Sequence, residues 1–224
     1  MKKVVIFGTG KYADQMFFYL KNDSPYEVAA FTVDGAYLRE GNFMGLPVVA
    51  FEEVQKDYPL GSYDMFIAVG YHNLNKFRAE KYSQAKVMGY KLISYVNSRA
   101  SNFGGVEIGD NCLVLENVVI QPLTKIGNDV FIWSGNHIGH HAQIGDHCYI
   151  AGQVMVGGSA VIETNCFIGM NATIGHEVII GRESFIGAGA MVTKNAPSSS
   201  VYIAQDTPRF RLDSNSFLKL TKMK

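Results

Sequence analysis

The sequence has no excess of either charge, few cysteines and no long apolar run. Its 20 basic and 20 acidic residues cancel, which gives no reason to expect a nucleic acid or an anionic membrane as a partner. No segment approaches the roughly 18 apolar residues of a membrane-spanning helix, and the start MKKVVIFGTG lacks a signal-peptide cleavage site. These absences predict a soluble, cytoplasmic protein with no membrane or nucleic-acid partner.

The second half of the chain repeats with a period of six. Every sixth residue from Ile108 to Val192 is isoleucine or valine. The series is Ile108, Val114, Ile120, Ile126, Ile132, Ile138, Ile144, Ile150, Val156, Ile162, Ile168, Ile174, Ile180, Ile186 and Val192. Two residues before each member stands a small or slender residue, such as Thr124 or Ala142. This period fits neither a helix, at about 3.6 residues per turn, nor the alternation of a single strand. It predicts the hexapeptide repeat of a parallel β-helix.

Three hexads are expected to form one coil, so that equivalent residues of successive coils stack at the strand spacing of roughly 4.8 Å. Each coil then buries its isoleucines against its neighbours. The three cysteines, Cys112, Cys148 and Cys166, all occupy the small position of the hexad. There they are predicted to be inward-facing fillers and not disulfides or metal ligands. The tail after Asn195 is not expected to continue the prism.

The first part of the chain has a different pattern, in which apolar strands alternate with helices. The predicted strands are 2–8, 26–34, 46–51, 63–70 and 90–97, and the predicted helices are 11–22 and 75–89. This alternation predicts a small parallel α/β sheet. The segment SRASNFGG breaks the pattern. The predicted domains are therefore 1–97, Rossmann-like; 98–203, β-helix; and 204–224, a C-terminal tail.

A glycine turn follows the first predicted strand. VVIFGTGKYA contains the pattern G-x-G-x-x-A, with Gly8 and Gly10 between strand and helix. Glycines let backbone N–H groups and a helix N-terminus approach a phosphate closely. Asp34, at the end of the second strand, is placed to accept from a ribose or a base edge. The pattern favours a mononucleotide portion over NAD, since a complete dinucleotide fold needs more strands; a tight turn that simply needs glycine is the alternative.

Histidines gather in the repeat region. They are His137, His140, His141, His147 and His176. His140 and His141 follow the inward Ile138 at a corner of the prism, where side chains point outward. A histidine there can act as a general base, because imidazole titrates near neutral pH; a solvated polar corner is the alternative reading.

The same histidines argue against a metal within one chain. His140 and His176 lie two coils apart, at roughly 9.6 Å by strand stacking. Zinc ligands sit at about 2.0–2.1 Å from the metal, so one ion could be shared only with a second subunit. No metal site is predicted.

The two halves together resemble the bacterial sugar acyltransferases of the sialic acid O-acetyltransferase type. These include acetyl-CoA-dependent N-acetyltransferases of UDP- or dTDP-linked 4-amino-4,6-dideoxy sugars, enzymes of cell-surface glycan and O-antigen biosynthesis. The resemblance runs from VVIFGTGKYA to SFIGAGAMVTKN, over about residues 1–203. It implies a left-handed β-helix, a homotrimer, a nucleotide-sugar bound across the N-terminal domain, and acetyl-CoA as co-substrate along a neighbour's coils.

The resemblance also assigns site residues. The segment IGHHAQIGD resembles the one that bears the catalytic base, which assigns His140, with His141 beside it, to catalysis. Gly158 corresponds to a backbone N–H that faces the thioester oxygen. The acetyl-CoA contacts that it implies are Tyr149, Gly158, Met170 and Ala188. The nucleotide-sugar contacts that it implies are Gly8, Gly10, Lys11, Tyr12, Asp34 and Arg78.

The chain departs from the family's pattern at three places. The family has Asp or Glu directly after the base, where this chain has His141. Its glycine turn reads GxGGHG against GTGKYA here, and its closing GxPAK motif appears only as AQDTPR. The departures bear on the partner that orients the base and on the nucleotide and CoA contacts.

Three other functions are open at this point. A sugar O-acetyltransferase would use the same base on a hydroxyl. A metalloenzyme of the γ-type carbonic anhydrase kind shares the prism and a histidine pair of this spacing, but its third ligand would fall at Gly181. A non-catalytic scaffold that binds nucleotide-sugar and trimerises is the third.

Overall fold

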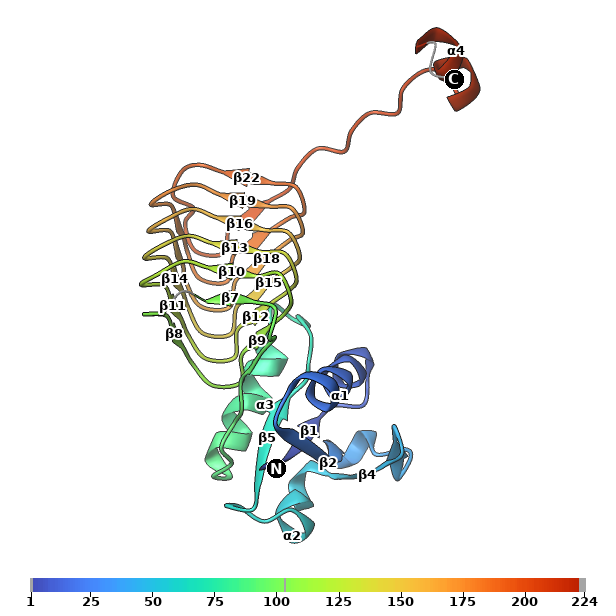
Figure 1. Cartoon of the computed structure of the whole chain (residues 1–224), viewed down its shortest axis with the longest axis vertical. Helices are drawn as coiled ribbons and strands as arrows, with labels where there is room; N and C mark the ends of the chain where they lie inside the picture. The colour runs from blue at the N-terminus through green and yellow to red at the C-terminus, as the bar shows by residue number, and fades with distance from the viewer. Residues whose placement is uncertain (1, 103, 222–224) are drawn as a thin grey trace.

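The computed structural model describes residues 2–102 and 104–221. An N-terminal α/β domain is followed by a stack of flat coils, and an extended segment then leads to a final helix that lies apart from the coils (Figure 1). The described part of the chain contains no helix long and apolar enough to cross a membrane.

The N-terminal domain is built on a twisted sheet of order β3-β4-β2-β1-β5, parallel except for β3. Its strands are β1 (Lys2–Phe7), β2 (Tyr26–Val33), β3 (Asn42–Phe43), β4 (Leu46–Ala50) and β5 (Tyr63–Ile67). Its helices are α1 (Lys11–Asp23), α2 (Val54–Asp57) and α3 (Lys76–Val87), with 3-10 turns η1 (Gly35–Tyr37) and η2 (Phe51–Glu53). The first four predicted strands and both predicted helices are confirmed. Val4, Val5 and Ile6 of the central strand are fully buried, as expected for a parallel strand covered on both faces.

The fifth predicted strand, 90–97, is divided between the two domains. Leu92 forms a single bridge with Met65 of β5, whereas β6 (Tyr95–Val96) pairs with a strand of the first coils. The prediction of one strand was wrong, because Tyr95 stands 18 residues before Leu113 and stacks on it in the repeat register. The β-helix thus begins before residue 98.

The β-helix has three faces, and successive coils add a two-residue strand to each face, where the strands pair in parallel. The first face, in chain order, is β6, β9 (Leu113–Val114), β12 (Phe131–Ile132), β15 (Tyr149–Ile150), β18 (Phe167–Ile168), β21 (Phe185–Ile186) and β23 (Val201–Tyr202). The second is β7 (Ser101–Asn102), β10 (Val119–Ile120), β13 (His137–Ile138), β16 (Met155–Val156), β19 (Thr173–Ile174) and β22 (Met191–Val192). The third is β8 (Glu107–Ile108), β11 (Lys125–Ile126), β14 (Gln143–Ile144), β17 (Val161–Ile162) and β20 (Ile179–Ile180).

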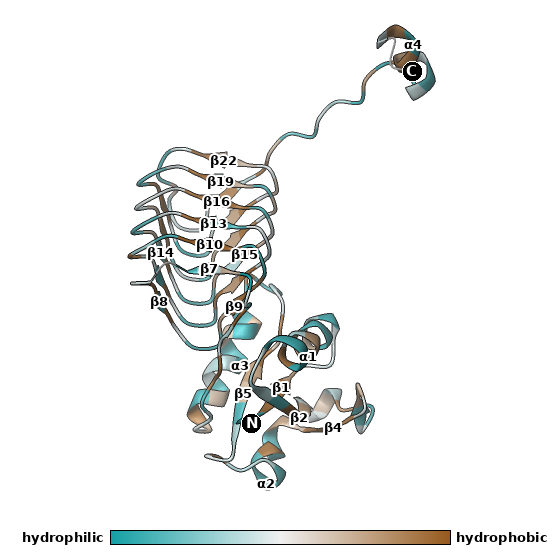
Figure 2. Ribbon diagram, in the orientation of Figure 1, coloured by the Kyte–Doolittle hydropathy of each residue, from teal (hydrophilic) through white to brown (hydrophobic). Residues whose placement is uncertain are grey.

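The predicted repeat register is confirmed. Residues 18 apart pair, as Ile120 does with Ile138, and all but the first of the fifteen repeat positions are buried, Ile108 being partly so. In Figure 2 the hydrophobic colour follows the stacked strands, and the turns between them are mostly hydrophilic. The core is therefore one column of aliphatic side chains along the coil axis.

The small position of the hexad also satisfies polar groups. Cys112, Cys148 and Cys166 are fully buried free thiols. Each donates a hydrogen bond to the carbonyl 15 residues along the chain, as Cys148 Sγ does to Glu163 O at 3.0 Å. Thr124 Oγ1 does the same to Gly139 O. The cysteines are thus inward fillers, as predicted, whose S–H groups find partners inside the prism.

Every coil turns its corners through a residue in the left-handed region. The non-glycine residues with this φ in the coils are Asn111, Asn117, Leu123, Asp129, His141, His147, Gln153, Ser159, Asn165, Asn171, Glu177 and Glu183. Gly135 and Gly189 fill two further places in the same six-residue series. Asn and Asp are the side chains that tolerate this conformation best. These corner positions point outward and are where the coils meet other groups.

The prism continues beyond Asn195, contrary to the prediction. Ala196 forms a bridge with Ile180 and packs on the core, and β23 pairs with β21. The register shortens here, since partners are 16 residues apart and not 18. The last helix, α4 (Ser214–Thr221), lies away from the coils (Figure 1).

Candidate functional site

The N-terminal domain docks on the first face of the β-helix. Leu113, Phe131 and Tyr149 of that face belong to one buried cluster with β1, β2 and α1. Phe66 of β5 stacks on Phe131 with ring centroids 5.8 Å apart. The outward residues of this face are therefore apolar because they form the seam between two domains.

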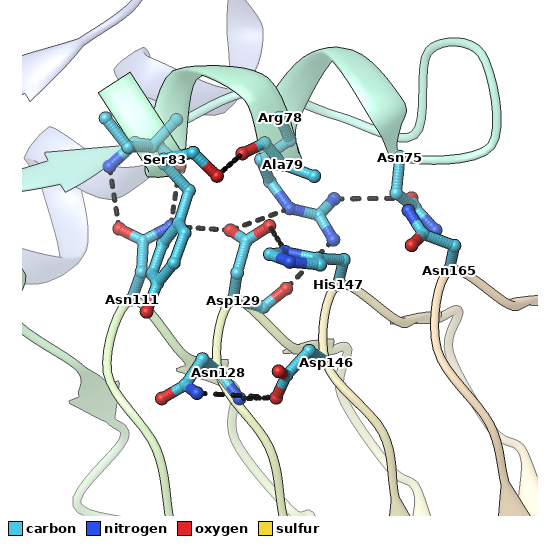
Figure 3. Close-up of polar contacts among 12 residues, drawn as sticks. Asn75, Arg78, Ala79, Ser83, Asn111, Asn128, Asp129, Asp146, His147 and Asn165 are labelled. Carbon is cyan, nitrogen blue, oxygen red and sulfur yellow. Dashed lines mark hydrogen bonds and ion pairs between the residues drawn. The ribbon is translucent and has the colours of Figure 1, made fainter. Parts of the chain in front are cut away.

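A ladder of polar corner residues extends the seam along the corner between the third and first faces (Figure 3). Asn111 and Asp129 are fully buried there. Asn111 accepts from Ile67 N and donates to Asp129 Oδ1 at 2.7 Å. His147 Nδ1 lies 2.8 Å from Asp129 Oδ2. Each of these corner residues adopts the left-handed conformation, and at this corner Asn111 and Asp129 bond to residues of the N-terminal domain.

Arg78 occupies the centre of this ladder. Its side chain is fully buried and pairs with Asp129 at 3.0 Å. It also donates to the carbonyls of Asp129 and Cys148, and its guanidinium lies 4.3 Å from the Phe131 ring centroid. Its remaining amino group donates to Gly70 O and Asn75 Oδ1 within its own domain. Arg78 therefore joins the two domains, and its predicted contact with the nucleotide stays a prediction. The sequence around Arg78 gives no indication that its partner, Asp129, lies 51 residues further along the chain.

A cavity of about 540 Å³ opens at the carboxyl ends of β1, β2 and β5. Gly8, Gly10, Tyr12 and Asp34 all line it, so four of the six predicted nucleotide-sugar residues lie together. The strand order reverses direction at β1, which is the place where α/β sheets bind ligands. Lys11 begins α1 and is exposed outside this lining.

The cavity combines aromatic walls, a glycine turn and one carboxylate. Gly8 has φ +119, and a Cβ there would lie 3.0 Å from Ala68 O, so only glycine fits. Tyr37 and Phe77 supply aromatic walls. Asp34 Oδ1 accepts from Lys81 Nζ at 2.6 Å. The arrangement suits a nucleotide, with a ring against the aromatics and a phosphate at the glycine turn.

The loop between β5 and α3 joins the cavity to the seam. Asn73, Leu74 and Asn75 are three successive residues with positive φ, a strained arrangement that the surroundings must maintain. Asn75 is fully buried and donates to Cys166 O at 3.1 Å. Tyr71, in the same loop, packs on Tyr149 with centroids 5.0 Å apart. The β-helix thus holds the wall of the cavity in place.

Tyr149 packs against Tyr12 and Tyr71 in the seam and does not lie at the histidine corner. It is buried on the first face, and its hydroxyl lies 3.1 Å from that of Tyr12. Burial raises its pKa, so the phenol is neutral. His140 lies on the corner between the second and third faces. Tyr149 thus lies on a face that the chain's own N-terminal domain covers, and its predicted contact with the acetyl group stays a prediction.

His140 and His141 are exposed at their corner, as predicted. Their Nδ1 atoms are 3.0 Å apart. A Cβ added to Gly158, one coil further, would lie 2.7 Å from His140 Nε2. The His140 ring therefore leans over a backbone that carries no side chain. His176 stands one further coil along, its ring centroid 6.2 Å from that of His140.

Backbone contacts hold this corner. His140 N donates to Gln121 Oε1 at 2.9 Å, and His141 N donates to Pro122 O at 3.2 Å. Met170 and Ala188 are exposed and stack one coil apart on another corner, between the first and second faces. Within one chain they are separated from His140 by the width of the second face.

The other histidines of the β-helix lie in different parts of the prism, and His72 lines the cavity of the N-terminal domain. His137 is an outward residue of β13, and His147 is held in the seam by Asp129. His176 contacts Glu177 at 3.4 Å. Among residues 2–102 and 104–221, no three His, Cys, Asp or Glu side chains are grouped to hold a metal ion.

Comparison with protein families finds repeats over much of the β-helix. The family described as bacterial transferase hexapeptide (six repeats) matches residues 123–158 and 159–194. Residues 96–122 match the hexapeptide repeat of succinyl-transferase. No curated protein matches the chain significantly.

Solved structures share the arrangement of both domains. A mutant of perosamine N-acetyltransferase from Caulobacter crescentus, in complex with CoA and GDP-perosamine, is 24% identical, with a TM-score of 0.77 over 89% of this chain and 92% of that chain. The acetyltransferase domain of PglB from Neisseria gonorrhoeae, in complex with acetyl coenzyme A, is 20% identical, with a TM-score of 0.77 over 89% and 95%. The fold is thus a Rossmann-like domain followed by a left-handed β-helix of transferase-type hexapeptide repeats.

Proposed function

We propose that the protein is an acetyltransferase that moves the acetyl group of acetyl-CoA to the amino group of a nucleotide-linked sugar. The class of acceptor is a 4-amino-4,6-dideoxy sugar on UDP or dTDP, as the sequence resemblance implies. The product would serve cell-surface glycan synthesis in the cytoplasm. Among the sugar acyltransferases of the sialic acid O-acetyltransferase type, the proposed reaction is that of the members that acetylate an amine.

One observation carries the proposal: the His140 ring lies directly over the bare backbone of Gly158. The base thus lies beside the Gly158 backbone, whose N–H we assign to the thioester oxygen. The Gly158 carbonyl accepts from Glu177 N, whereas the N–H of Gly158 has no hydrogen-bond partner among the backbone and side-chain bonds of the described residues. An unused N–H beside a base is what an acyl transfer needs to hold an oxyanion.

The reaction follows from these two groups. The sugar nitrogen attacks the thioester carbonyl carbon while His140 Nε2 takes a proton from that nitrogen. The N–H of Gly158 stabilises the oxyanion, worth roughly 3 kcal/mol when the geometry is good. The C–S bond then breaks, and the sulfur receives the proton from His140, which gives the N-acetyl sugar and CoA. Holding both substrates in line supplies much of the remaining acceleration.

The nucleotide part of the acceptor is assigned to the cavity of the N-terminal domain. Gly8, Gly10, Tyr12 and Asp34 line that cavity; we assign the first three to the phosphates and Asp34 to the base. The acetyl-CoA arm is assigned to Gly158, Met170 and Ala188. The last two lie on a different corner from His140, so two prisms side by side, in a homotrimer, would bring them to one groove.

The experiment is a thiol-release assay with acetyl-CoA and a panel of 4-amino and 3-amino nucleotide sugars, with matched hydroxyl sugars beside them. Rapid release with an amino sugar and none with its hydroxyl counterpart supports N-acetylation. Preference for the hydroxyl sugar would replace it with O-acetylation, the second candidate. No release with any acceptor would refute the proposal. Light scattering of the purified protein tests the trimer.

A further inference from the structure

The two imidazoles of the histidine corner meet through like atoms. His140 Nδ1 and His141 Nδ1 are 3.0 Å apart with rings nearly perpendicular, at 88°. A hydrogen bond between two Nδ1 atoms needs one proton, carried by one ring, and a lone pair on the other. Two protonated Nδ1 atoms would repel, and two bare ones would leave no bond.

The proposed function decides which ring donates, and the inference rests on it. A base must present a bare Nε2 to its substrate, so neutral His140 carries its proton on Nδ1. It is Nε2 of His140 that leans over Gly158. His140 is therefore the donor, and His141 accepts through a bare Nδ1 and keeps its own proton on Nε2.

We propose that His141 is a positioning residue: a neutral acceptor that fixes the tautomer and the orientation of His140. When Nε2 of His140 takes the amine proton, the Nδ1 proton stays between the two rings and no proton passes to His141. The acceptor in this chain carries no charge, so it orients the base without adding a carboxylate to the groove. In proteins, the hydrogen bond made by one imidazole nitrogen commonly determines which of the two nitrogens carries the proton.

Few charged or titratable groups face the pair. On the neighbouring coils, His176 lies 6.2 Å from His140 between ring centroids. Glu177 contacts His176 at 3.4 Å and not His141. Gln121, on the preceding coil, is neutral and is engaged by the His140 backbone N–H. Among the described residues His141 is thus the side chain bonded to Nδ1 of His140.

Two substitutions of His141 test whether it acts as a hydrogen-bond acceptor or only fills space. His141 has φ +59, and the same corner position of the preceding coil holds Leu123 with φ +64. His141→Leu therefore removes the acceptor with a residue that this corner already accommodates. His141→Asn keeps an acceptor oxygen near the place of Nδ1 and tolerates the left-handed backbone.

The test measures kcat and both KM values of the native, His141→Leu and His141→Asn proteins. We expect His141→Leu to lose about 10-fold or more in kcat, part of what a positioned base contributes, with both KM values unchanged. His141→Asn should recover most of that loss. Native kcat in His141→Leu, or equal losses in both variants, would overturn the proposal.

A second readout does not depend on turnover. In protein with ¹⁵N-labelled histidine, nitrogen NMR of the free enzyme should show a protonated Nδ1 on His140 and a bare Nδ1 on His141. In His141→Leu the His140 signal should become a mixture of tautomers. The opposite assignment would refute the inference even if acetyl transfer is observed. If no acetyl transfer is found while the tautomers are as stated, the proposed function fails and the hydrogen-bonded pair remains.

Discussion

Arg78 Nε donates to Asp129 Oδ1 over 3.0 Å, and neither side chain is exposed to solvent. The bond joins α3 of the N-terminal domain to a corner of the β-helix. Burying two charges is costly unless both are fully hydrogen-bonded. Here the Asp129 carboxylate also forms hydrogen bonds with Asn111 and His147. Arg78 donates further hydrogen bonds to two backbone carbonyls. The pair therefore specifies how the domains dock.

The first prediction concerns this pair. Arg78→Met leaves the Asp129 carboxylate buried without its cation, which should lower the free energy of unfolding by about 3–5 kcal/mol. Urea unfolding measures the change. Lys86→Met is the matched control, because its pair with Asp110 is partly exposed and is worth about 1 kcal/mol or less. Equal effects of the two substitutions would contradict a special role for the buried pair.

The second prediction concerns Gly158. Gly158→Ala places a methyl group 2.7 Å from His140 Nε2, so the ring must swing away from the groove. We expect kcat to fall by about 10²-fold, the lower end of what a general base contributes, while nucleotide-sugar affinity stays unchanged. Gly41→Ala serves as control, since no atom lies within 4 Å of its added Cβ. Retention of native kcat in Gly158→Ala would show that His140 does not need this space.

The third prediction concerns the nucleotide cavity. Asp34→Asn removes the charge that faces the cavity and weakens the bond to Lys81. A hydrogen bond to a charged group is worth about 1.5–3 kcal/mol, so the Kd for UDP or dTDP should rise by about 10-fold or more. Calorimetric titration measures it, with Asp64→Asn as control, because Asp64 lines a separate depression near Lys2. An unchanged Kd in Asp34→Asn would place the nucleotide elsewhere.

The fourth prediction follows from burial of Cys112. Desolvation raises the pKa of this thiol to about 12. Between the ordinary thiol value and this one, the unfolded chain loses the proton first, so stability falls as pH rises, by roughly 1.4 kcal/mol per pH unit. Cys112→Ala, which uses a residue common at the small position, should flatten the decline above pH of about 9. Unfolding measured at several alkaline pH values checks this; an identical slope in both proteins would contradict it.

Sequence periodicity predicts the β-helix well because one local rule decides each residue. An aliphatic side chain at every sixth position is buried on the axis of the coils, and Ile120 stacks on Ile138 as expected. The cavity was also predictable, since Gly8 and Asp34 follow strands whose carboxyl ends meet at one edge. His140 and His141 were found as outward corner residues for the same reason.

The docking of the domains was not predictable, because it depends on partners far apart in the chain. Arg78, on a helix of the N-terminal domain, pairs with Asp129 of the β-helix, and no local sequence pattern links the two. No local pattern shows that the face bearing Tyr149 is covered by the N-terminal domain. A weak signal did exist: Asn111, Asp129 and Asn165 recur at left-handed corners, and their identity is compatible with either solvent or a partner.

The most direct test of the proposed function compares native protein with His140→Ala in the thiol-release assay, using the best amino-sugar acceptor. Nucleotide-sugar affinity is measured on both proteins by calorimetry. We predict a loss of about 10²–10⁴-fold in turnover with nearly unchanged affinity, since the cavity proposed for the nucleotide lies in the other domain. Native turnover in His140→Ala would contradict it.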